Sequence, residues 1–253
     1  MKARKQVRAG IIYQGPSLID GAPIVVIGVY PTGTTTNAKT GRFVQTFILR
    51  SDLAPVDAIR TGDDSSICGD CKHRGNGSGF GSRSCYVNVG QSPTSVYRAF
   101  VRGSYARLSD DEIRELGRAR MVRLGAYGDP AAAPVEMWRM LVADAIGHTG
   151  YTHAWRAPFA APLASLCMAS ADTDAERAQA QALGWRTFRV RMPNEPMAQR
   201  EFACPASAEM GHRVTCSDCR ACNGTSTGRK GSPVIIAHGA FARRFAVNQS
   251  RAS

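Results

Sequence analysis

Residues 121–134 read Met-Val-Arg-Leu-Gly-Ala-Tyr-Gly-Asp-Pro-Ala-Ala-Ala-Pro: a short apolar run, a glycine turn, and a proline of the kind that opens a helix. We expect a strand over 121–126 and a helix from Pro134. The apolar face of this helix would carry Val135, Trp138, Leu141, Val142, Ala145 and Ile146. The same order recurs, with strands expected at 150–155, 166–171 and 185–192, and helices expected after Pro162 and from Thr173 to Gly184. This alternation predicts the α/β class, with a parallel sheet that is either open or part of a barrel.

Upstream of this repeat the chain favours strands and then helices. Apolar runs at 23–30 and 43–49 flank a turn-forming segment, residues 31–41, and predict an N-terminal β-hairpin element. Ser92 and Pro93 predict the start of a helix that stops at Gly103. Ser109 followed by Glu112 is a capping box for a helix over about 110–120.

Seven of the eight cysteines fall into two groups. The first cysteine group is Cys68, Cys71 and Cys85, in the pattern Cys-x2-Cys-x13-Cys. The second cysteine group is Cys204, Cys216, Cys219 and Cys222, in the run Cys-Pro-x10-Cys-x2-Cys-x2-Cys. Three thiolates at successive intervals of three are typical of iron–sulfur ligands, whereas structural zinc usually takes two separated pairs. The spacing predicts a two-site metalloprotein with 4Fe-4S clusters, and zinc is the alternative metal.

The first cysteine group is one ligand short of four. His73 or Cys167 could complete a zinc site, or the fourth position could stay open for chemistry. Cys167 is equally well explained as a buried residue of the expected strand at 166–171. The segment between Cys71 and Cys85 is rich in glycine and is expected to be an irregular loop that folds around an ion.

The N-terminal residues 1–8, Met-Lys-Ala-Arg-Lys-Gln-Val-Arg, are basic, so no signal peptide is expected. We therefore expect reduced thiols, not disulfides, and a cytoplasmic location. No stretch approaches the roughly 20 apolar residues of a membrane span, so no membrane association is expected. The net charge of +12 predicts a polyanionic partner, most simply nucleic acid, although a solvated basic surface would carry the same charge.

Ligands of parallel sheets gather at the carboxyl ends of the strands. The predicted strand ends carry Tyr127, Gly128, Asp129, His153, Trp155, Arg156 and Asp172. Arg189 and Arg191 alternate with apolar residues, so both are expected on one face of the last strand. Each candidate has a simpler explanation: His153 and Trp155 as core residues, Asp172 as part of a helix cap, and the arginines as solvated charges.

The order of these parts resembles that of the radical S-adenosylmethionine (SAM) enzymes. Members of that superfamily place three cysteines in a loop after the first barrel strand, then a helix, then a second strand that ends in a Gly-Gly-Glu-Pro type motif. Here the three cysteines are the first cysteine group, the helix starts at Pro93, and the second strand ends in Gly-Ala-Tyr-Gly-Asp-Pro over 125–130. The similarity covers about residues 60–195. The cysteine spacing is wider than the usual x3 then x2, and Asp129 stands where the family has glutamate.

The resemblance implies a partial (β/α) barrel over residues 61–198, preceded by a basic tail and hairpin element (1–60) and followed by a cysteine-rich metal-binding extension (199–253). The second cysteine group is similar to the auxiliary-cluster extension of many such enzymes. The chain is also loosely similar to uncharacterised phage-encoded proteins, which would place it in the cytoplasm of a bacterial host.

In radical SAM enzymes, a 4Fe-4S cluster with one open iron binds SAM, and one-electron reduction releases a 5′-deoxyadenosyl radical. The resemblance implies that Gly128 lets the backbone approach the methionine amino group, that Asp129 or the carbonyls near it accept its hydrogen bonds, and that Arg189 or Arg191 pairs with the carboxylate. It also implies a reductant protein as a partner. The expected activity is modification of a nucleic acid or a peptide. The alternative is a non-catalytic zinc or iron–sulfur protein that binds nucleic acid through its basic surface.

Overall fold

The computed structural model describes residues 6–33, 39–75, 80–226, 228, 231–238 and 242–250. One sheet runs through the molecule, in the strand order β1-β2-β3-β4-β5-β6-β7-β9-β8. The strands are β1 (Ala9–Pro16), β2 (Pro23–Val29), β3 (Phe43–Arg50), β4 (Met121–Tyr127), β5 (Gly147–Thr152), β6 (Met168–Ala171), β7 (Thr187–Arg191), β8 (Glu201–Ala203) and β9 (Ser232–Ile236).

The α-helices are α1 (Pro55–Thr61), α2 (Ser65–Cys68), α3 (Ser92–Val101), α4 (Asp110–Gly117), α5 (Val135–Val142), α6 (Asp174–Ala182), α7 (Cys216–Cys219) and α8 (Ala242–Ser250). Short 3₁₀ turns are η1 (Lys72–Arg74), η2 (Pro130–Ala132), η3 (Ala154–Arg156), η4 (Pro158–Ser165) and η5 (Ala208–Met210). Among the described residues, no helix has the length and apolar character needed to cross a membrane.

The sheet is mixed but mostly parallel. β1, β2 and β3 pair antiparallel, and every later pairing, from β3–β4 to β9–β8, is parallel. Six parallel strands, β3, β4, β5, β6, β7 and β9, are neighbours in the order in which they occur in the chain. The sheet is not closed, because β1 and β8 each pair with one strand only. The predicted α/β class is confirmed.

The core lies along the central strands. The run 24–27 of β2 is fully buried, as are Val44, Ile48 and Leu49 of β3, because both faces of these strands are covered. Trp138 of α5 is also fully buried, and its Nε1 donates to the carbonyl of Pro130 at 2.9 Å. The helix therefore holds the turn that follows β4.

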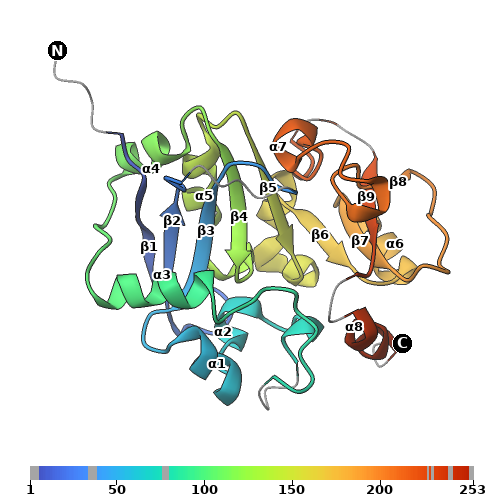
Figure 1. Ribbon diagram of the computed structural model, residues 1–253, viewed down its shortest axis with the longest axis horizontal. Coiled ribbons are helices and arrows are strands. Elements are labelled where there is room, and N and C mark those ends of the chain that lie inside the picture. Colours follow the sequence, from blue (N-terminus) through green and yellow to red (C-terminus); the bar gives the residue numbers. More distant parts are fainter. Residues whose placement is uncertain are drawn as a thin grey trace.

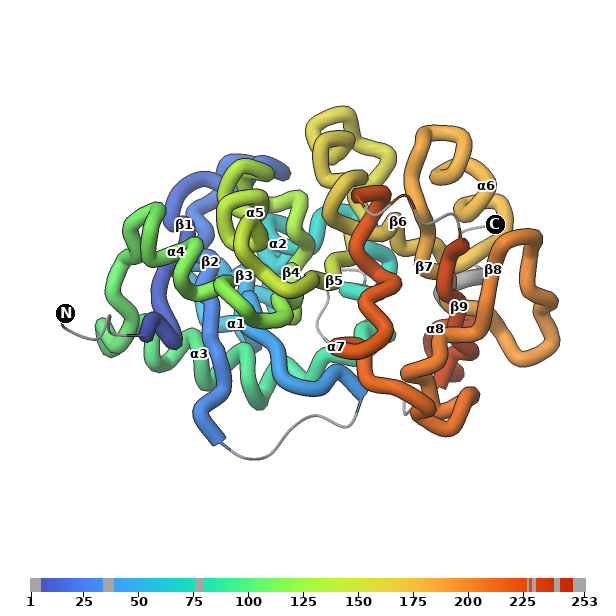
Figure 2. Tube along the Cα trace, turned by 90° about the horizontal axis from the view of Figure 1, so that it is seen from above, coloured from blue at the N-terminus to red at the C-terminus, as the bar shows by residue number. Residues whose placement is uncertain are grey.

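The parallel strands have distinct surroundings at their two ends (Figure 1). β4 points toward α2 and α8, and α7 lies at the other end of the strands. Hydrogen bonds fix α7 there: the N–H of Cys216 donates to the carbonyl of Lys39 just before β3, and Arg220 donates to the carbonyl of Ile146 just before β5. Seen from above, α7 lies between α2 and β9, and β9 lies beside β8 (Figure 2).

Several predicted elements are confirmed. β2 and β3 form the expected hairpin, which is continuous with the parallel strands because β3 also pairs with β4. Ser109 and Glu112 form the capping box of α4, and Thr173 caps α6. Gly103 and Gly184 follow α3 and α6 with positive φ angles, as a helix stop requires.

Other boundaries differ from prediction. β5 begins at Gly147, three residues earlier than expected, so that His153 follows the strand and Trp155 lies in η3. The glycines of the Gly-His-Thr-Gly run concealed its β-structure, but Gly150 is needed because a Cβ there would meet the sulfur of Cys167 at 2.6 Å. β1, β8 and β9 were not predicted. Residues 1–5 of the predicted basic tail and 76–79 of the predicted loop lie outside the described residues.

Candidate metal centre

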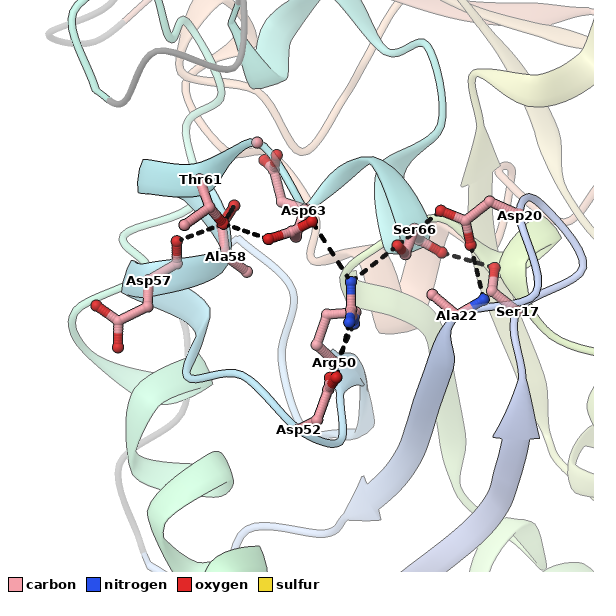
Figure 3. Close-up of polar contacts among 12 residues, drawn as sticks. Ser17, Asp20, Ala22, Arg50, Asp52, Asp57, Ala58, Thr61, Asp63 and Ser66 are labelled. Atoms are coloured by element: carbon pink, nitrogen blue, oxygen red, sulfur yellow. Dashed lines mark hydrogen bonds and ion pairs between the residues drawn. The ribbon is translucent and has the colours of Figure 1, made fainter.

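A polar network holds α2 at the carboxyl end of β3 (Figure 3). Arg50, the last residue of β3, donates from Nη1 to the hydroxyl of Ser66 at 3.2 Å. That hydroxyl donates to Asp20 at 2.7 Å, and the hydroxyl of Ser17 donates to the carbonyl of Ser66 at 2.7 Å. The network ties α2 to β3 and to the turn between β1 and β2. It therefore fixes Cys68, the last residue of α2.

Backbone amides of the following loop point at two sulfurs of the first cysteine group. The N–H groups of His73 and Arg74 donate to the sulfur of Cys71, and the N–H of Val87 donates to that of Cys85. Such bonds favour the thiolate, which is the form that binds metals. Burial opposes them: it raises the pKa of Cys71 to about 12 and also raises the pKa of Cys85. The sulfurs are therefore neutral thiols near pH 7 unless a metal ion displaces their protons.

The cysteines of each group act on one another electrostatically, and all eight are free thiols. No three cysteine sulfurs in the described part of the chain lie within 4.8 Å of one another. Sulfurs that share one zinc ion at about 2.3 Å would lie closer together than this. The sulfurs of an iron–sulfur cube each bind a different iron atom and are farther apart. As they lie among the described residues, no three cysteine sulfurs are close enough to share one zinc ion.

The turn after β4 packs directly against the loop that carries the first cysteine group. The N–H of Asp129 donates to the carbonyl of Ile67 at 2.6 Å, next to Cys68. Gly128 has φ +80°, and a Cβ there would lie 2.7 Å from the Cβ of Ile48. Glycine is therefore required here because the backbone of this turn packs directly against Ile48 of β3.

The carboxylate of Asp129 is buried between two loops. It accepts hydrogen bonds from the N–H of Ala131 at 2.9 Å and from the N–H of His153 at 2.7 Å. Burial raises the pKa of Asp129. Asp129 also acts electrostatically on Cys71. It lies near Cys71 of the first cysteine group, and both of its oxygens already accept backbone hydrogen bonds.

A group of two histidines and a carboxylate lies beside Cys71. The ligand atoms of His73, His153 and Asp172 all lie within 4.8 Å of one another, and these are donors of the kind that bind zinc and other transition metals. Nε2 of His73 is hydrogen-bonded to Asp172 at 2.8 Å, and Nδ1 is hydrogen-bonded to Ser84 at 2.8 Å. Both ring nitrogens of His73 therefore have partners other than the cysteine sulfurs.

The carboxylates around Asp172 are paired with basic side chains, without a bound metal ion. Lys72 lies 3.2 Å from Asp172 and 3.3 Å from Glu176, and Arg156 lies 3.2 Å from Glu176. Two carboxylates thus face two basic side chains. Burial alone would raise the pKa of Asp172, but the hydrogen bond from His73 and the neighbouring positive charges lower it to about 2. This network joins the cysteine loop to β6 and α6.

The C-terminal helix α8 covers this loop (Figure 1). The ring of Phe245 stacks on that of His73, with centroids 5.3 Å apart and an angle of 10° between the planes. Arg244 donates to the carbonyls of Phe80 at 3.2 Å and Arg83 at 3.4 Å. Phe245 is buried by this contact. The C-terminal helix therefore packs against the segment that joins Cys71 to Cys85, while the three cysteines stay partly exposed.

Two buried side chains near the first cysteine group carry hydrogen-bond donors that lack acceptors among the described residues. Within the described residues, Nη1 and Nη2 of Arg83 and the hydroxyl of Tyr127 have no hydrogen-bond partner. Arg83 is 4% exposed and Tyr127 is 2% exposed. Both act electrostatically on Cys68 or Cys85. Tyr127 was a predicted strand-end candidate. Arg83 was not predicted, because its position in a glycine-rich loop gave no sign that it is buried.

The second cysteine group lies over the sheet and reaches the amino ends of the parallel strands through α7. The N–H of Ala206 donates to the sulfur of Cys204, and the hydroxyl of Tyr151 on β5 donates to that of Cys222. Burial raises the pKa of Cys222 to about 12. The structure thus brings four thiols together, as the sequence predicted, and adds a tyrosine that the sequence did not single out.

Arg189 and Arg191 share one face of β7, as predicted, and both are buried. Every hydrogen bond described for their side chains goes to the segment that follows β7. Arg189 pairs with Glu201 at 2.7 Å, and Arg191 pairs with Glu209 at 2.7 Å. The two arginines therefore hold β8 and η5 in place and are not grouped with the thiols or with Asp129.

Cys167 is separate from both groups. It is fully buried in the core, where Gly150 packs against its sulfur. Burial raises its pKa well above the ordinary value for a thiol. It is a packed residue next to β6, which was the simpler of the two predicted explanations.

No family model matches this chain, and no curated protein and no solved structure matches it either.

Proposed function

We propose that the chain is a divergent radical SAM-like iron–sulfur enzyme that generates a 5′-deoxyadenosyl radical to modify a nucleic acid or a peptide. The observation that carries the proposal is the position of the first cysteine group. Three thiols follow β3, lie against the turn after β4, and face residues that follow β5 and β6. They occupy the carboxyl edge of the sheet, where α/β enzymes bind their ligands.

The order of the strands supports the finer part of the proposal, a partial (β/α) barrel. Six parallel strands, from β3 to β9, lie side by side in chain order, as in a barrel. Among the described strands, β8 alone departs from this order, and it lies at the edge of the sheet beyond β9. The thiols come after the first of these strands, and the Gly-Asp-Pro turn comes after the second. Both positions match the layout of the radical SAM enzymes.

The donor set fits a 4Fe-4S cluster. Cys68, Cys71 and Cys85 supply soft sulfur ligands with backbone N–H groups directed at two of them, and three ligands leave one iron open. When bound, such a cluster would supply the electron that cleaves SAM. The chain supplies the enclosure: α8 covers the loop and limits the access of water.

Other residues of the chain shape the surroundings of the proposed cofactor site. Gly128 allows the close packing of the turn on the cysteine loop, and Asp129 fixes the loop after β5 through the N–H of His153. In the proposal these two residues shape the cofactor side of the site. Arg189 and Arg191, which glutamates hold, shape the segment after β7 instead.

The second cysteine group supplies four thiols and is proposed to hold an auxiliary cluster. Four ligands complete the coordination of a cube, so this centre would transfer electrons or stabilise the fold without an open iron. A reductant protein is the proposed partner that delivers electrons. The net charge of +12 supports nucleic acid as the substrate or partner.

The test uses protein that is purified and reconstituted without oxygen. We expect about eight iron atoms per chain, four in each cube, and release of 5′-deoxyadenosine from SAM after reduction with dithionite. Cys85→Ala should remove about half of the iron and all of the nucleoside release. Cys167→Ala is the matched control, because it removes a buried thiol that belongs to neither group.

Unchanged nucleoside release in Cys85→Ala would remove the assignment. Tightly held zinc in anaerobic, iron-replete preparations, with no nucleoside release, would instead support the alternative of a non-catalytic nucleic-acid-binding protein.

A further inference from the structure

The charges beside the first cysteine group do not balance. Asp64, which is 1% exposed, faces two guanidinium groups. Arg74 donates two hydrogen bonds to Oδ1 of Asp64, from Nε at 3.1 Å and from Nη2 at 2.7 Å. Arg83 is left with a contact of 3.6 Å from Nη1 to Oδ2, which is too long for a hydrogen bond. One carboxylate and two guanidinium groups leave one positive charge uncompensated.

That surplus charge is enclosed. Asp64 is the only carboxylate within ion-pair distance of Arg83 among the residues that the structure describes, and the Arg83 side chain is 5% exposed. A buried and unpaired charge costs several kcal/mol, so a stable fold needs an anion beside it. The carboxylates near Asp172 face an equal number of basic side chains, whereas Arg83 has a positive charge in excess.

A metal centre on the thiols would supply the missing anion. Three thiolates exceed by one the two positive charges of a zinc ion or of an oxidised 4Fe-4S cube, so the bound centre is a monoanion in either case. Arg83 acts directly on Cys68, on Cys85 and on Tyr127. The Tyr127 hydroxyl lacks an acceptor in the same place, and sulfur atoms of the centre would accept from it.

We propose that Arg83 and Tyr127 are the electrostatic partners of a monoanionic metal centre held by Cys68, Cys71 and Cys85, and that they set its metal affinity and its reduction potential. The inference rests on the metal-binding part of the proposed function. Reduction adds a negative charge to the centre, and a fixed positive charge nearby favours that state. Arg83 therefore raises the reduction potential, and the hydrogen bond from Tyr127 acts in the same direction.

The first measurement is Co²⁺ binding to the full-length chain without oxygen, followed through the thiolate-to-metal absorption that Cys71→Ala removes. We expect Arg83→Gln to weaken Co²⁺ binding at this group by about 10- to 100-fold, the usual cost of losing an outer-shell partner. Arg83→Lys should recover most of the affinity, because it restores the charge. Arg120→Gln is the control: Arg120 is 6% exposed and donates to carbonyls at the other end of β4.

The second measurement is a redox titration of the reconstituted iron–sulfur protein, monitored by electron paramagnetic resonance. The midpoint potential of the centre that Cys71→Ala removes should fall in Arg83→Gln and fall less in Tyr127→Phe. It should be unchanged in Arg120→Gln. A tenfold change in the reduction equilibrium corresponds to about 59 mV for one electron. Tyr127→Phe removes one hydroxyl and keeps the ring, so it tests the idea even if Arg83→Gln fails to fold.

The outcomes separate the two proposals. Co²⁺ affinity and midpoint potential that stay at wild-type values in both Arg83→Gln and Tyr127→Phe would overturn the role of these residues, as would a wild-type chain that binds no Co²⁺ at the first cysteine group. A wild-type chain that binds Co²⁺ in an Arg83-dependent way but releases no deoxyadenosine would support the inference and remove the radical enzyme.

Discussion

The two cysteine groups differ in what surrounds the thiols. The first has three thiols at the carboxyl edge of the sheet, a buried guanidinium and a buried hydroxyl without acceptors, and a helix laid over it. The second has four thiols, extends to the amino ends of the strands through α7, and receives a hydrogen bond from Tyr151. Sites that complete their coordination with protein ligands are usually structural, and sites with an open position are usually catalytic. The comparison supports the proposal that the first group is the catalytic centre and the second an auxiliary one.

The strands that lead to the two cysteine groups are also held in place by different interactions. β2 and β3, which lead to the first cysteine group, are buried apolar strands. β7 and β8, which lead to the second, are joined by the buried pair Arg189 and Glu201. An apolar strand holds its position without a partner of opposite charge, whereas an ion pair fails when either member is lost. The segment that carries the second cysteine group should therefore be the easier one to detach from the sheet.

The largest expected effect separates the groups by function. Cys71→Ala should abolish release of 5′-deoxyadenosine, whereas Cys219→Ala should lose about four iron atoms and keep most of the release. The physical reason is that only the first group leaves a coordination position open. Iron analysis and nucleoside assay on the same anaerobic preparations measure both quantities. Equal loss of release in the two variants would erase the distinction between a catalytic and a supporting group.

The next effect concerns stability. Glu201→Gln should lower the free energy of unfolding by about 1–3 kcal/mol, because it removes the closest and most buried carboxylate of Arg189 and leaves, among the described residues, only Glu195, whose oxygen lies 3.5 Å from the guanidinium. Glu209→Gln is the matched change in a more exposed pair and should cost less. Urea unfolding of metal-free protein gives both values. A loss as small in Glu201→Gln as in Glu209→Gln would mean that the buried pair does not hold β8.

The same pair predicts a pH dependence. Burial alone would raise the pKa of Glu201, but the hydrogen bond from Arg189 lowers it below the ordinary value of about 4.3. The pair therefore stabilises the fold above that pH, and its contribution is lost as the pH falls through the lower folded pKa. The difference in unfolding free energy between wild type and Glu201→Gln should be full at pH 7 and should shrink below about pH 4. A difference that grows on acidification would contradict this sign.

The smallest effect compares two helix caps. Thr215 precedes α7, where its N–H and hydroxyl donate to Asp218, and Ser109 forms the similar box of α4. Thr215→Ala and Ser109→Ala should each cost about 1 kcal/mol of stability. Only Thr215→Ala should speed the loss of iron from the second cysteine group to a chelator, because α7 carries Cys216 and Cys219. Equal rates in the two variants would show that α7 does not need its cap to hold metal.

Local signals made much of the fold predictable. The apolar runs of β2, β3 and β4 and the capping boxes at Ser109 and Thr173 depend on neighbours within a few residues. β8 and β9 could not be predicted in this way. β8 has three residues and β9 contains Pro233; β9 is a strand because β7 offers an edge to pair with, and β8 is a strand because it pairs with β9.

The grouping of the thiols was predictable, but the charges that surround them were not. Spacing alone grouped the seven cysteines. Alternation placed Arg189 and Arg191 on one face of β7, but whether they would meet a ligand or a glutamate depended on residues 12 and 18 positions away. The surplus charge of Arg83 arises only when Arg74, Asp64 and the cover from α8 come together. Burial is a property of the fold, and a residue type in a glycine-rich loop does not reveal it.

The cover of α8 over the first cysteine loop has a consequence for the order of assembly. Arg244 and its acceptors Phe80 and Arg83 are 164 and 161 residues apart in the chain. Contacts at such separation close long loops and form late, both in time of synthesis and in folding. The thiols are therefore gathered and open to solvent before the helix that covers them can dock. If the proposed metal centre forms, it would be inserted in the interval between these two events, and the length of chain between the loop and its cover would lengthen that interval.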